Sequence, residues 1–233
     1  KKLFRKKNKI FKPLTPIQFK YCEVFNRLGF NIDLTNHEFA DPLAINNETQ
    51  QIIYGTNNKL KWVGVAPFAS FNGKTYPLDL MQQLVAFLQR DHQVFLFGNG
   101  EFETGKLEIW ANAYQNVFGA YKLGSLYNEL EIISNLDLMI SMDSANGHLA
   151  ANYGVPVITL WGLTHPFGGF APFSSNSENM IISNRELFPK IPTSAYGIKI
   201  PKGYEKAMRT INYNDVAARC LKILENPKHY RNL

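Results

Sequence analysis

The feature that most constrains the fold is an alternation of short β-rich runs with helical patterns, which starts after Lys61 and continues to Leu224. Such alternation is typical of βα units around a parallel sheet. Six runs have the composition of strands: 62–66, 93–97, 116–119, 137–141, 156–161 and 179–183. The sequence therefore predicts an α/β protein with a doubly wound, six-stranded parallel sheet in the order 3-2-1-4-5-6.

Helical patterns separate and flank these runs. Apolar residues share one helical face in two of them, at Leu78, Met81, Leu84, Val85 and Leu88, and at Leu126, Leu130, Ile133 and Leu136. Amphipathic helices are also predicted over 15–28 and 214–224, whereas 31–60 is rich in Asn, Asp and Thr, which is typical of a linker. We therefore divide the chain into 1–60, a helix and linker, and 61–233, the sheet domain.

Composition is that of a globular domain, with 233 residues, 45% hydrophobic and 19% charged. No apolar window approaches the roughly 18 residues that a membrane-spanning helix requires. Cys22 and Cys220 lie far apart without a CxxC or CxxH companion, so we expect a reduced, cytoplasmic protein. The sequence opens Lys-Lys-Leu-Phe, and we expect it to be a piece of a longer polypeptide.

Much of the net charge of +6 is local, since six cationic residues fall within the first nine: Lys1, Lys2, Arg5, Lys6, Lys7 and Lys9. Such a run is commonly a solvated terminus, and peripheral contact with an anionic membrane is the alternative. Nucleic acid is not expected as a partner, because no basic motif with interleaved aromatic residues follows.

Ligands of such a sheet bind beyond the carboxyl ends of the strands where the strand order reverses, between the first and fourth strands. That rule selects the loops 67–75 and 142–148. The second loop leads into a short helix, whose free N–H groups and partial positive charge suit a pyrophosphate. We expect Asp143 or Ser144 to cap this helix, and the small residues Ser144, Ala145 and Gly147 to admit a bulky ligand.

Each of these residues also has an ordinary structural interpretation. An Asp-Ser pair is commonly a simple helix cap, and a histidine such as His148 on an apolar helix commonly packs in a core. Lys74 follows Gly73 in a flexible turn, where most lysines are solvated. We expect its ammonium to reach the mouth of the site, and its replacement to change stability little.

Several chemistries are disfavoured by missing motifs. The first strand is not followed by G-x-G-x-x-G, and Gly98-Asn-Gly100 lacks the third glycine, which disfavours hydride transfer. The chain has no Walker lysine motif, no G-x-S-x-G, no HExxH and no Asp-x-Asp to hold a metal-bound sugar nucleotide. We therefore expect metal-independent chemistry without a cofactor.

Three elements together carry a family resemblance: 63–67 with 73–77, 133–150, and 154–162 with Thr164. The sequence resembles the C-terminal domain of the lipopolysaccharide heptosyltransferases, the family 9 glycosyltransferases of the GT-B fold. The resemblance implies a Rossmann-like domain that binds a nucleotide sugar, with 1–60 as the remnant of an N-terminal acceptor domain and linker.

The resemblance also implies a donor site. Lys74 would contact the donor phosphates, Asp143, Ser144, Ala145 and His148 would cradle the diphosphate and sugar, and Glu101 or Glu103 would hold the ribose. Ser70 and Gly98 complete this expected site. Ser144 and Ala145 stand where the family has threonine and glycine, and Tyr76 stands where it has tryptophan.

The implied function is that of the donor-binding half of an inverting, metal-independent glycosyltransferase. It would transfer a heptose or related sugar from a nucleotide sugar, ADP-heptose foremost, to a lipopolysaccharide core or other glycan acceptor. The general base is expected outside this chain, which alone would be inactive. The alternative is a non-catalytic or epimerase-like domain that binds sugar nucleotides.

Overall fold

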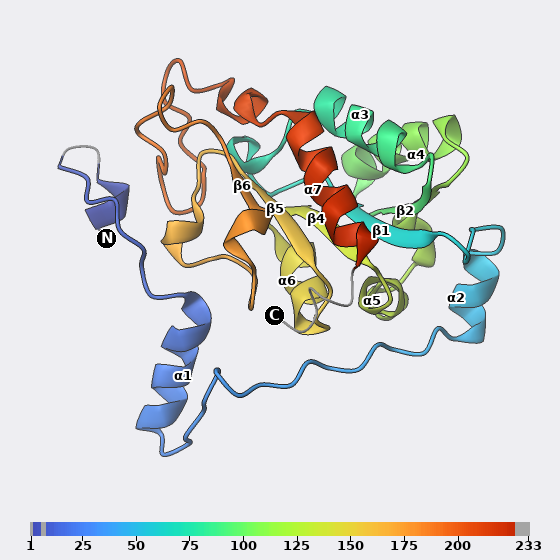
Figure 1. The fold of residues 1–233 in the computed structure, drawn as a ribbon, viewed down its shortest axis with the longest axis horizontal. Coiled ribbons are helices and arrows are strands. Elements are labelled where there is room, and N and C mark those ends of the chain that lie inside the picture. The colour runs from blue at the N-terminus through green and yellow to red at the C-terminus, as the bar shows by residue number, and fades with distance from the viewer. Residues whose placement is uncertain (1, 6–7, 227–233) are drawn as a thin grey trace.

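The six predicted strands form one parallel sheet. The computed structural model describes residues 2–5 and 8–226, so Lys1, Lys6 and Lys7 of the basic run lie outside the described residues. The strands are β1 Lys61–Ala66, β2 His92–Leu96, β3 Val117–Gly119, β4 Leu138–Met142, β5 Val157–Trp161 and β6 Met180–Ile182. Their order is β3-β2-β1-β4-β5-β6 (Figure 1), which confirms the doubly wound prediction.

Helices cover both faces of the sheet (Figure 1). One face is covered by α3 (Leu78–Leu88), α4 (Glu101–Ala113) and α7 (Tyr213–Glu225), and the other by α2 (Asn47–Ile52), α5 (Leu126–Ser134) and α6 (Ala145–Asn152). Alternate side chains of a strand point to opposite faces, so Val63 and Val65 join the first core while Trp62 packs against the second. Every residue of β4 and β5 is buried, as a strand between two helical layers requires.

The stretch 31–60 contains α2, a helix that the sequence does not predict. The side-chain oxygen of Asn46 caps it by accepting a hydrogen bond from the Thr49 amide at 2.8 Å. Just before it, the Leu43 amide donates to Ser134 Oγ at 3.0 Å, and the Leu43 carbonyl accepts from Asn135 Nδ2 at 2.8 Å. Part of this stretch therefore packs on the sheet domain.

The predicted N-terminal helix is present as α1 (Ile17–Arg27), and it stands apart from the sheet in Figure 1. None of its residues is buried, and its apolar side chains are open, with Val24 at 55% exposure and Phe25 at 46%. Within 2–5 and 8–226, no helix is long and apolar enough to span a bilayer.

An aromatic cluster anchors the segment before α1. Phe11 lies 3.4 Å below the Arg185 guanidinium, and its ring centroid is 4.9 Å from that of His165 and 4.8 Å from that of Phe167. His165 is 5% exposed, and its Nδ1 accepts a hydrogen bond from the Phe167 amide at 3.0 Å. Burial, helped by the nearby cations Arg185 and Lys9, lowers the pKa of His165 to about 4.

This lowered pKa predicts a loss of stability in acid. Below about pH 6.5 the unfolded chain binds a proton at His165 that the folded protein rejects, so stability falls as the pH decreases from about 6.5 toward 4. We expect this residue to account for about 1–3 kcal/mol of lost stability at about pH 4.5. Urea unfolding near pH 7.5 and pH 4.5 should show a smaller pH effect in His165→Asn, which retains an acceptor but does not titrate. Equal pH sensitivity in both proteins would contradict this assignment.

Tyr76 joins two segments that are distant in the sequence. It is completely buried, and its hydroxyl donates to the Ile211 carbonyl at 2.8 Å, which ties the turn before α3 to the start of α7. Burial, assisted by the charge of Asp79, raises its pKa to about 12, so the hydroxyl remains a donor at neutral pH.

We expect Tyr76→Phe to lower the free energy of unfolding by about 1–2 kcal/mol, because the buried Ile211 carbonyl loses its partner. Tyr121→Phe is the matched control, since the buried Tyr121 hydroxyl has no hydrogen-bond partner among the described residues. Its removal should leave stability unchanged or raise it. Chemical denaturation of both variants measures the difference, and equal losses would refute the role of the Tyr76 hydroxyl.

Candidate functional site

The loops after β1 and β4 are neighbours because these two strands pair in parallel, with Ala66 opposite Ser141. α6 begins directly after β4. Ser144 is its N-cap residue, yet no side chain caps the helix, and Ser144 Oγ lies 3.0 Å from Ser141 Oγ instead. The prediction that Asp143 or Ser144 caps this helix is therefore wrong, because both side chains have other partners. The first turn keeps its N–H groups available for an anion.

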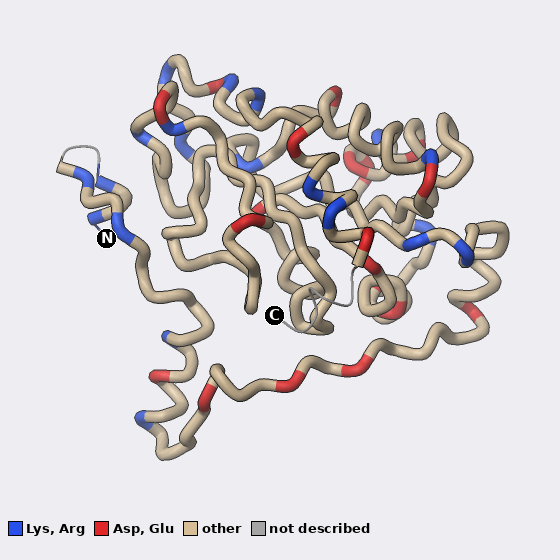
Figure 2. Tube along the Cα trace, in the orientation of Figure 1, with Lys and Arg blue, Asp and Glu red and all other residues tan. Residues whose placement is uncertain are grey.

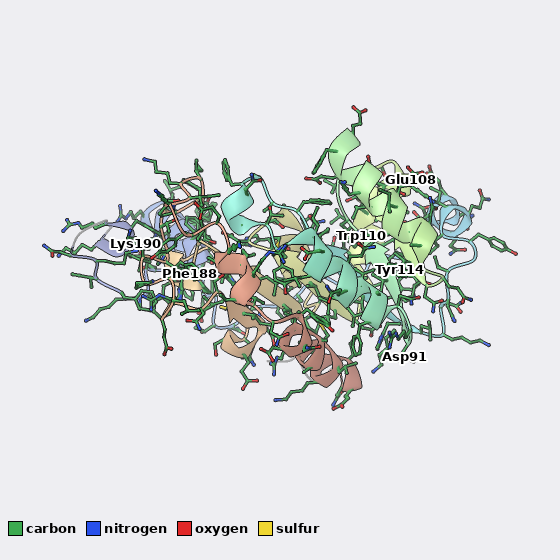
Figure 3. The ribbon with its side chains drawn as sticks, turned by 90° about the horizontal axis from the view of Figure 1, so that it is seen from above. Asp91, Glu108, Trp110, Tyr114, Phe188 and Lys190 are labelled. Atoms are coloured by element: carbon green, nitrogen blue, oxygen red, sulfur yellow. The ribbon has the colours of Figure 1, made fainter. Side chains whose placement is uncertain are left out.

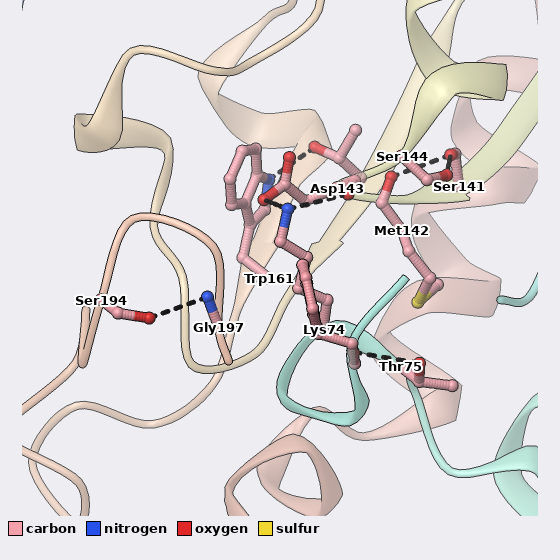
Figure 4. Close-up of polar contacts among 11 residues, drawn as sticks. Lys74, Thr75, Ser141, Met142, Asp143, Ser144, Trp161, Ser194 and Gly197 are labelled. Atoms are coloured by element: carbon pink, nitrogen blue, oxygen red, sulfur yellow. Dashed lines mark hydrogen bonds and ion pairs between the residues drawn. The ribbon is translucent and has the colours of Figure 1, made fainter. Parts of the chain in front are cut away.

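Lys74 and Asp143 form an ion pair at this point (Figure 4). Lys74 Nζ lies 2.8 Å from Asp143 Oδ2 and donates to the Asp143 carbonyl at 3.3 Å. Their side chains are only 13% and 6% exposed. The alternative interpretation of Lys74 as a solvated lysine is thus wrong, and the buried pair argues against the expectation that its replacement changes stability little. Lys74 ends a 3-10 turn, η2 (Asn72–Lys74).

Two glycines allow the close packing around Lys74. A Cβ on Gly73 would lie 2.2 Å from the Gly197 carbonyl oxygen, and one on Gly197 would lie 3.0 Å from Lys74 Cγ. Gly197 also has φ +69°, a left-handed conformation that favours glycine. The Gly73 carbonyl accepts from the Leu163 amide at 2.8 Å. The connection between β6 and α7 thereby forms one wall of the site.

His148, the fourth residue of α6, belongs to the same electrostatic cluster. Burial lowers its pKa, the Asp143 carboxylate raises it, and the Lys74 ammonium lowers it. The three groups that the sequence selected from two separate loops therefore influence one another. Together they present a cation, a carboxylate and an imidazole biased toward its neutral form beside an open helix N-terminus.

A cavity of about 460 Å³ continues from this helix end along the carboxyl ends of β2 and β3. It is lined by Gly98, Asn99, Glu103, Tyr121, Gly124, Ser125, Leu126, Glu129 and Asn146. Glu103 Oε2 accepts from the Asn99 amide at 2.9 Å, and burial raises the pKa of Glu129. The size of this cavity and its lining of both polar and apolar residues suit a nucleoside.

The other predicted residues lie at varying distances from this centre. Of the two ribose candidates, Glu103 lines the cavity, whereas Glu101 is the exposed first residue of α4. Ser70 is exposed on the loop before η2, and Ala145 is the exposed first residue of α6.

Sequence reasoning missed several residues here. Ser125, Glu129 and Asn146 line the cavity, and Gly197 packs on Lys74. The carboxyl-end rule, if applied to the third strand as well, selects the Gly-Ser pair that ends in Ser125. Thr164 is 2% exposed, and its Oγ1 has no hydrogen-bond partner among the described residues. Within those same residues, no three His, Cys, Asp or Glu side chains gather as a metal site.

The family profile described as "Glycosyltransferase family 9 (heptosyltransferase)" matches residues 2–194. The chain belongs to glycosyltransferase family 9. This confirms the resemblance seen in the sequence. No curated protein sequence matches the chain.

Solved structures of similar fold include family 9 enzymes at low sequence identity. A family 9 glycosyltransferase from Veillonella parvula has a TM-score of 0.65 at 17% identity, over 91% of this chain and 60% of that one. ADP-heptose lipopolysaccharide heptosyltransferase II of E. coli gives 0.61 at 15%, over 85% and 57%. E. coli heptosyltransferase WaaC with ADP gives 0.53 at 15%, over 75% and 48%. The chain thus shares their fold and corresponds to about half to three fifths of their length.

The buried ion pair predicts a stability effect that can be measured by a mutant cycle. Lys74→Ala leaves the Asp143 carboxylate buried without its cation, and we expect a loss of about 1–3 kcal/mol in unfolding free energy. Lys74→Ala with Asp143→Asn should recover part of this loss, because the second change removes the unpaired charge. Urea denaturation of the two single variants and the double variant gives the coupling energy. Strictly additive losses would argue against the pair.

Proposed function

We propose that this chain is the donor-binding half of a glycosyltransferase that moves a heptose or related sugar from an ADP-linked donor to a glycan acceptor. The observation that carries the proposal is the position of Lys74 beside the uncapped N-terminus of α6, at the point where the strand order reverses. A diphosphate carries its charge where these two sources of positive potential converge. Family membership and the ADP complex of the related WaaC favour a nucleotide-sugar donor.

In the proposed reaction, the acceptor hydroxyl displaces the nucleoside diphosphate from the anomeric carbon with inversion. Negative charge grows on the departing diphosphate, and Lys74 and the N–H groups of α6 stabilise it. The general base comes from a part of the enzyme outside this chain. Metal independence is proposed because the sequence has no Asp-x-Asp motif.

The ion pair with Asp143 affects how Lys74 can bind a donor phosphate. The ammonium is already paired at 2.8 Å, so a donor phosphate shares it with Asp143 or displaces the carboxylate. The carboxylate then becomes available to accept hydrogen bonds from sugar hydroxyls. We propose that Asp143 orients the sugar and that Glu103 and Glu129, in the adjoining cavity, contact the nucleoside ribose.

The proposed acceptor is a lipopolysaccharide core or a related glycan. Such acceptors are membrane-borne, and we propose that the enzyme works in the cytoplasm at the inner membrane, with the basic N-terminal run near the anionic surface. A domain that binds sugar nucleotides without transfer, or with epimerase-like chemistry, is the second candidate. The uncapped helix and Lys74 serve a diphosphate in either case, and turnover distinguishes them.

Calorimetric titration of this chain tests the donor assignment. We expect ADP to bind at least about tenfold more tightly than UDP or GDP, with no change on addition of EDTA. Lys74→Ala should weaken ADP binding by about 10- to 100-fold, because a charge-assisted contact of roughly 1.5–3 kcal/mol is lost. Lys59→Ala is the control, since Lys59 is exposed and lies before the amino end of β1, whereas the site lies at the carboxyl end.

Two results would contradict the proposal. Equal ADP affinity in folded wild-type and Lys74→Ala protein would remove Lys74 from the phosphate site. Transfer of a sugar by this chain alone would contradict the placement of the general base elsewhere. Addition of the N-terminal half of a family 9 enzyme distinguishes the two candidate functions. If this chain is part of a transferase, sugar transfer should require the added half, whereas ADP binding should not.

A further inference from the structure

A second, larger cavity lies between the N-terminal segment and the connection from β6 to α7. Its volume is about 620 Å³, and it is lined by Arg5, Lys9, Pro189, Lys190, Thr193, Lys199, Ile200 and Pro201. Four of these eight residues are cationic and none is acidic. Figure 2 shows basic residues in both segments, and Figure 3 places Lys190 near the N-terminal end of the chain.

Hydrogen bonds hold the two walls of this cavity together. Lys9 Nζ donates to the carbonyl oxygens of Lys190 and Pro192, which fixes the N-terminal segment on the connection. Arg185 Nε donates to the Ile191 carbonyl at 3.0 Å, within the same connection. Burial and the charge of Arg185 lower the pKa of Lys9, which indicates a poorly solvated wall. The cavity is therefore a built feature of the fold, and Lys9 mainly supports it.

The remaining cations have their side chains available to a ligand. Arg5, Lys190 and Lys199 are exposed residues at the rim. The apolar part of the lining comes from Pro189, Ile200 and Pro201, and Ile198 beside it is 56% exposed. A single compartment thus combines three positive charges with hydrocarbon surface. This combination matches a molecule that carries phosphate at one end and apolar groups at the other.

We propose that this cavity binds the phosphate-bearing headgroup of an amphiphile, with Arg5, Lys190 and Lys199 around the phosphate and Ile200 and Pro201 against its apolar part. The chemistry is the same for a lipid in a bilayer and for a free phosphorylated molecule. The identification of this ligand with the acceptor rests on the proposed function, whereas its binding does not.

The cavity lies close to the proposed donor site. Thr193 lines the cavity, and its amide donates to the Leu163 carbonyl at 2.9 Å. Four residues later, Gly197 packs against Lys74. One short segment therefore separates the cavity from the proposed phosphate site, and a molecule held there would be kept close to the donor.

Binding of dihexanoyl phosphatidic acid, kept below its micelle concentration, tests the proposal by calorimetry on the full chain. We expect saturable binding, with dihexanoyl phosphatidylcholine much weaker because its net charge is zero. Lys190→Gln with Lys199→Gln should weaken binding by about tenfold or more. Lys202→Gln, an exposed lysine of the same connection that does not line the cavity, should change it by less than about twofold. If the double variant melts early, Lys199→Gln alone replaces it.

Sedimentation with phosphatidylglycerol vesicles separates the two sources of the ligand. Vesicle binding that the double variant loses assigns the cavity to a bilayer lipid, and binding of the soluble lipid without vesicle binding assigns it to a free phosphorylated molecule. Equal affinities of wild type and double variant, or equal affinities for phosphatidic acid and phosphatidylcholine, would overturn the proposal. The affinity for ADP should be the same in wild type and in these variants. Failure of wild type to bind ADP would count against the donor assignment and would leave the lipid site untouched.

Discussion

The parallel pairing of β1 with β4 is the constraint on which the rest of the structure depends. Chain connections run outward in opposite directions from these two strands, so the loops that follow them meet without an intervening helix. Both strands are buried between helical layers, which fixes their register through the side chains on each face. A slip of one residue would turn Val63 and Val65 away from their core and would move both loops. The geometry of the site is therefore set by sheet packing.

Within that frame, the Lys74–Asp143 pair decides the electrostatics of the site. An ion pair with both side chains largely withdrawn from water costs desolvation energy that its attraction must offset. Such a pair contributes little net stability, yet removing one partner is costly. What the fold gains is a positioned ammonium and a positioned carboxylate in a region of low dielectric, where each acts more strongly on a ligand than it would in water.

The strands and the sheet order were predictable because they depend on local composition and on alternation, as in β4, where four of the five residues are apolar. The site was predictable in part, since the carboxyl-end rule located both loops and the family motif selected Lys74. The surroundings of Lys74 were not predictable. Its partner Asp143 lies 69 residues away, and Gly197, which packs against it, lies in a connection without periodicity. Helix α2, with six residues, is too short for a periodic pattern. It is held by contacts from outside its own sequence: the Asn46 amide donates to Glu131 of α5, and Ile52 and Ile53 pack in the second core.

The contact of Gly197 with Lys74 has a thermodynamic consequence. The segment from Thr193 to Gly197 touches both proposed ligand sites, so any adjustment of it that one ligand favours alters the surroundings of the other. Coupling of this kind requires that one ligand shifts the segment, and it is then reciprocal: whatever factor the first ligand imposes on the affinity for the second, the second imposes on the first. Five residues of irregular backbone are thus the element through which filling of the neighbouring cavity would change the affinity for a nucleotide.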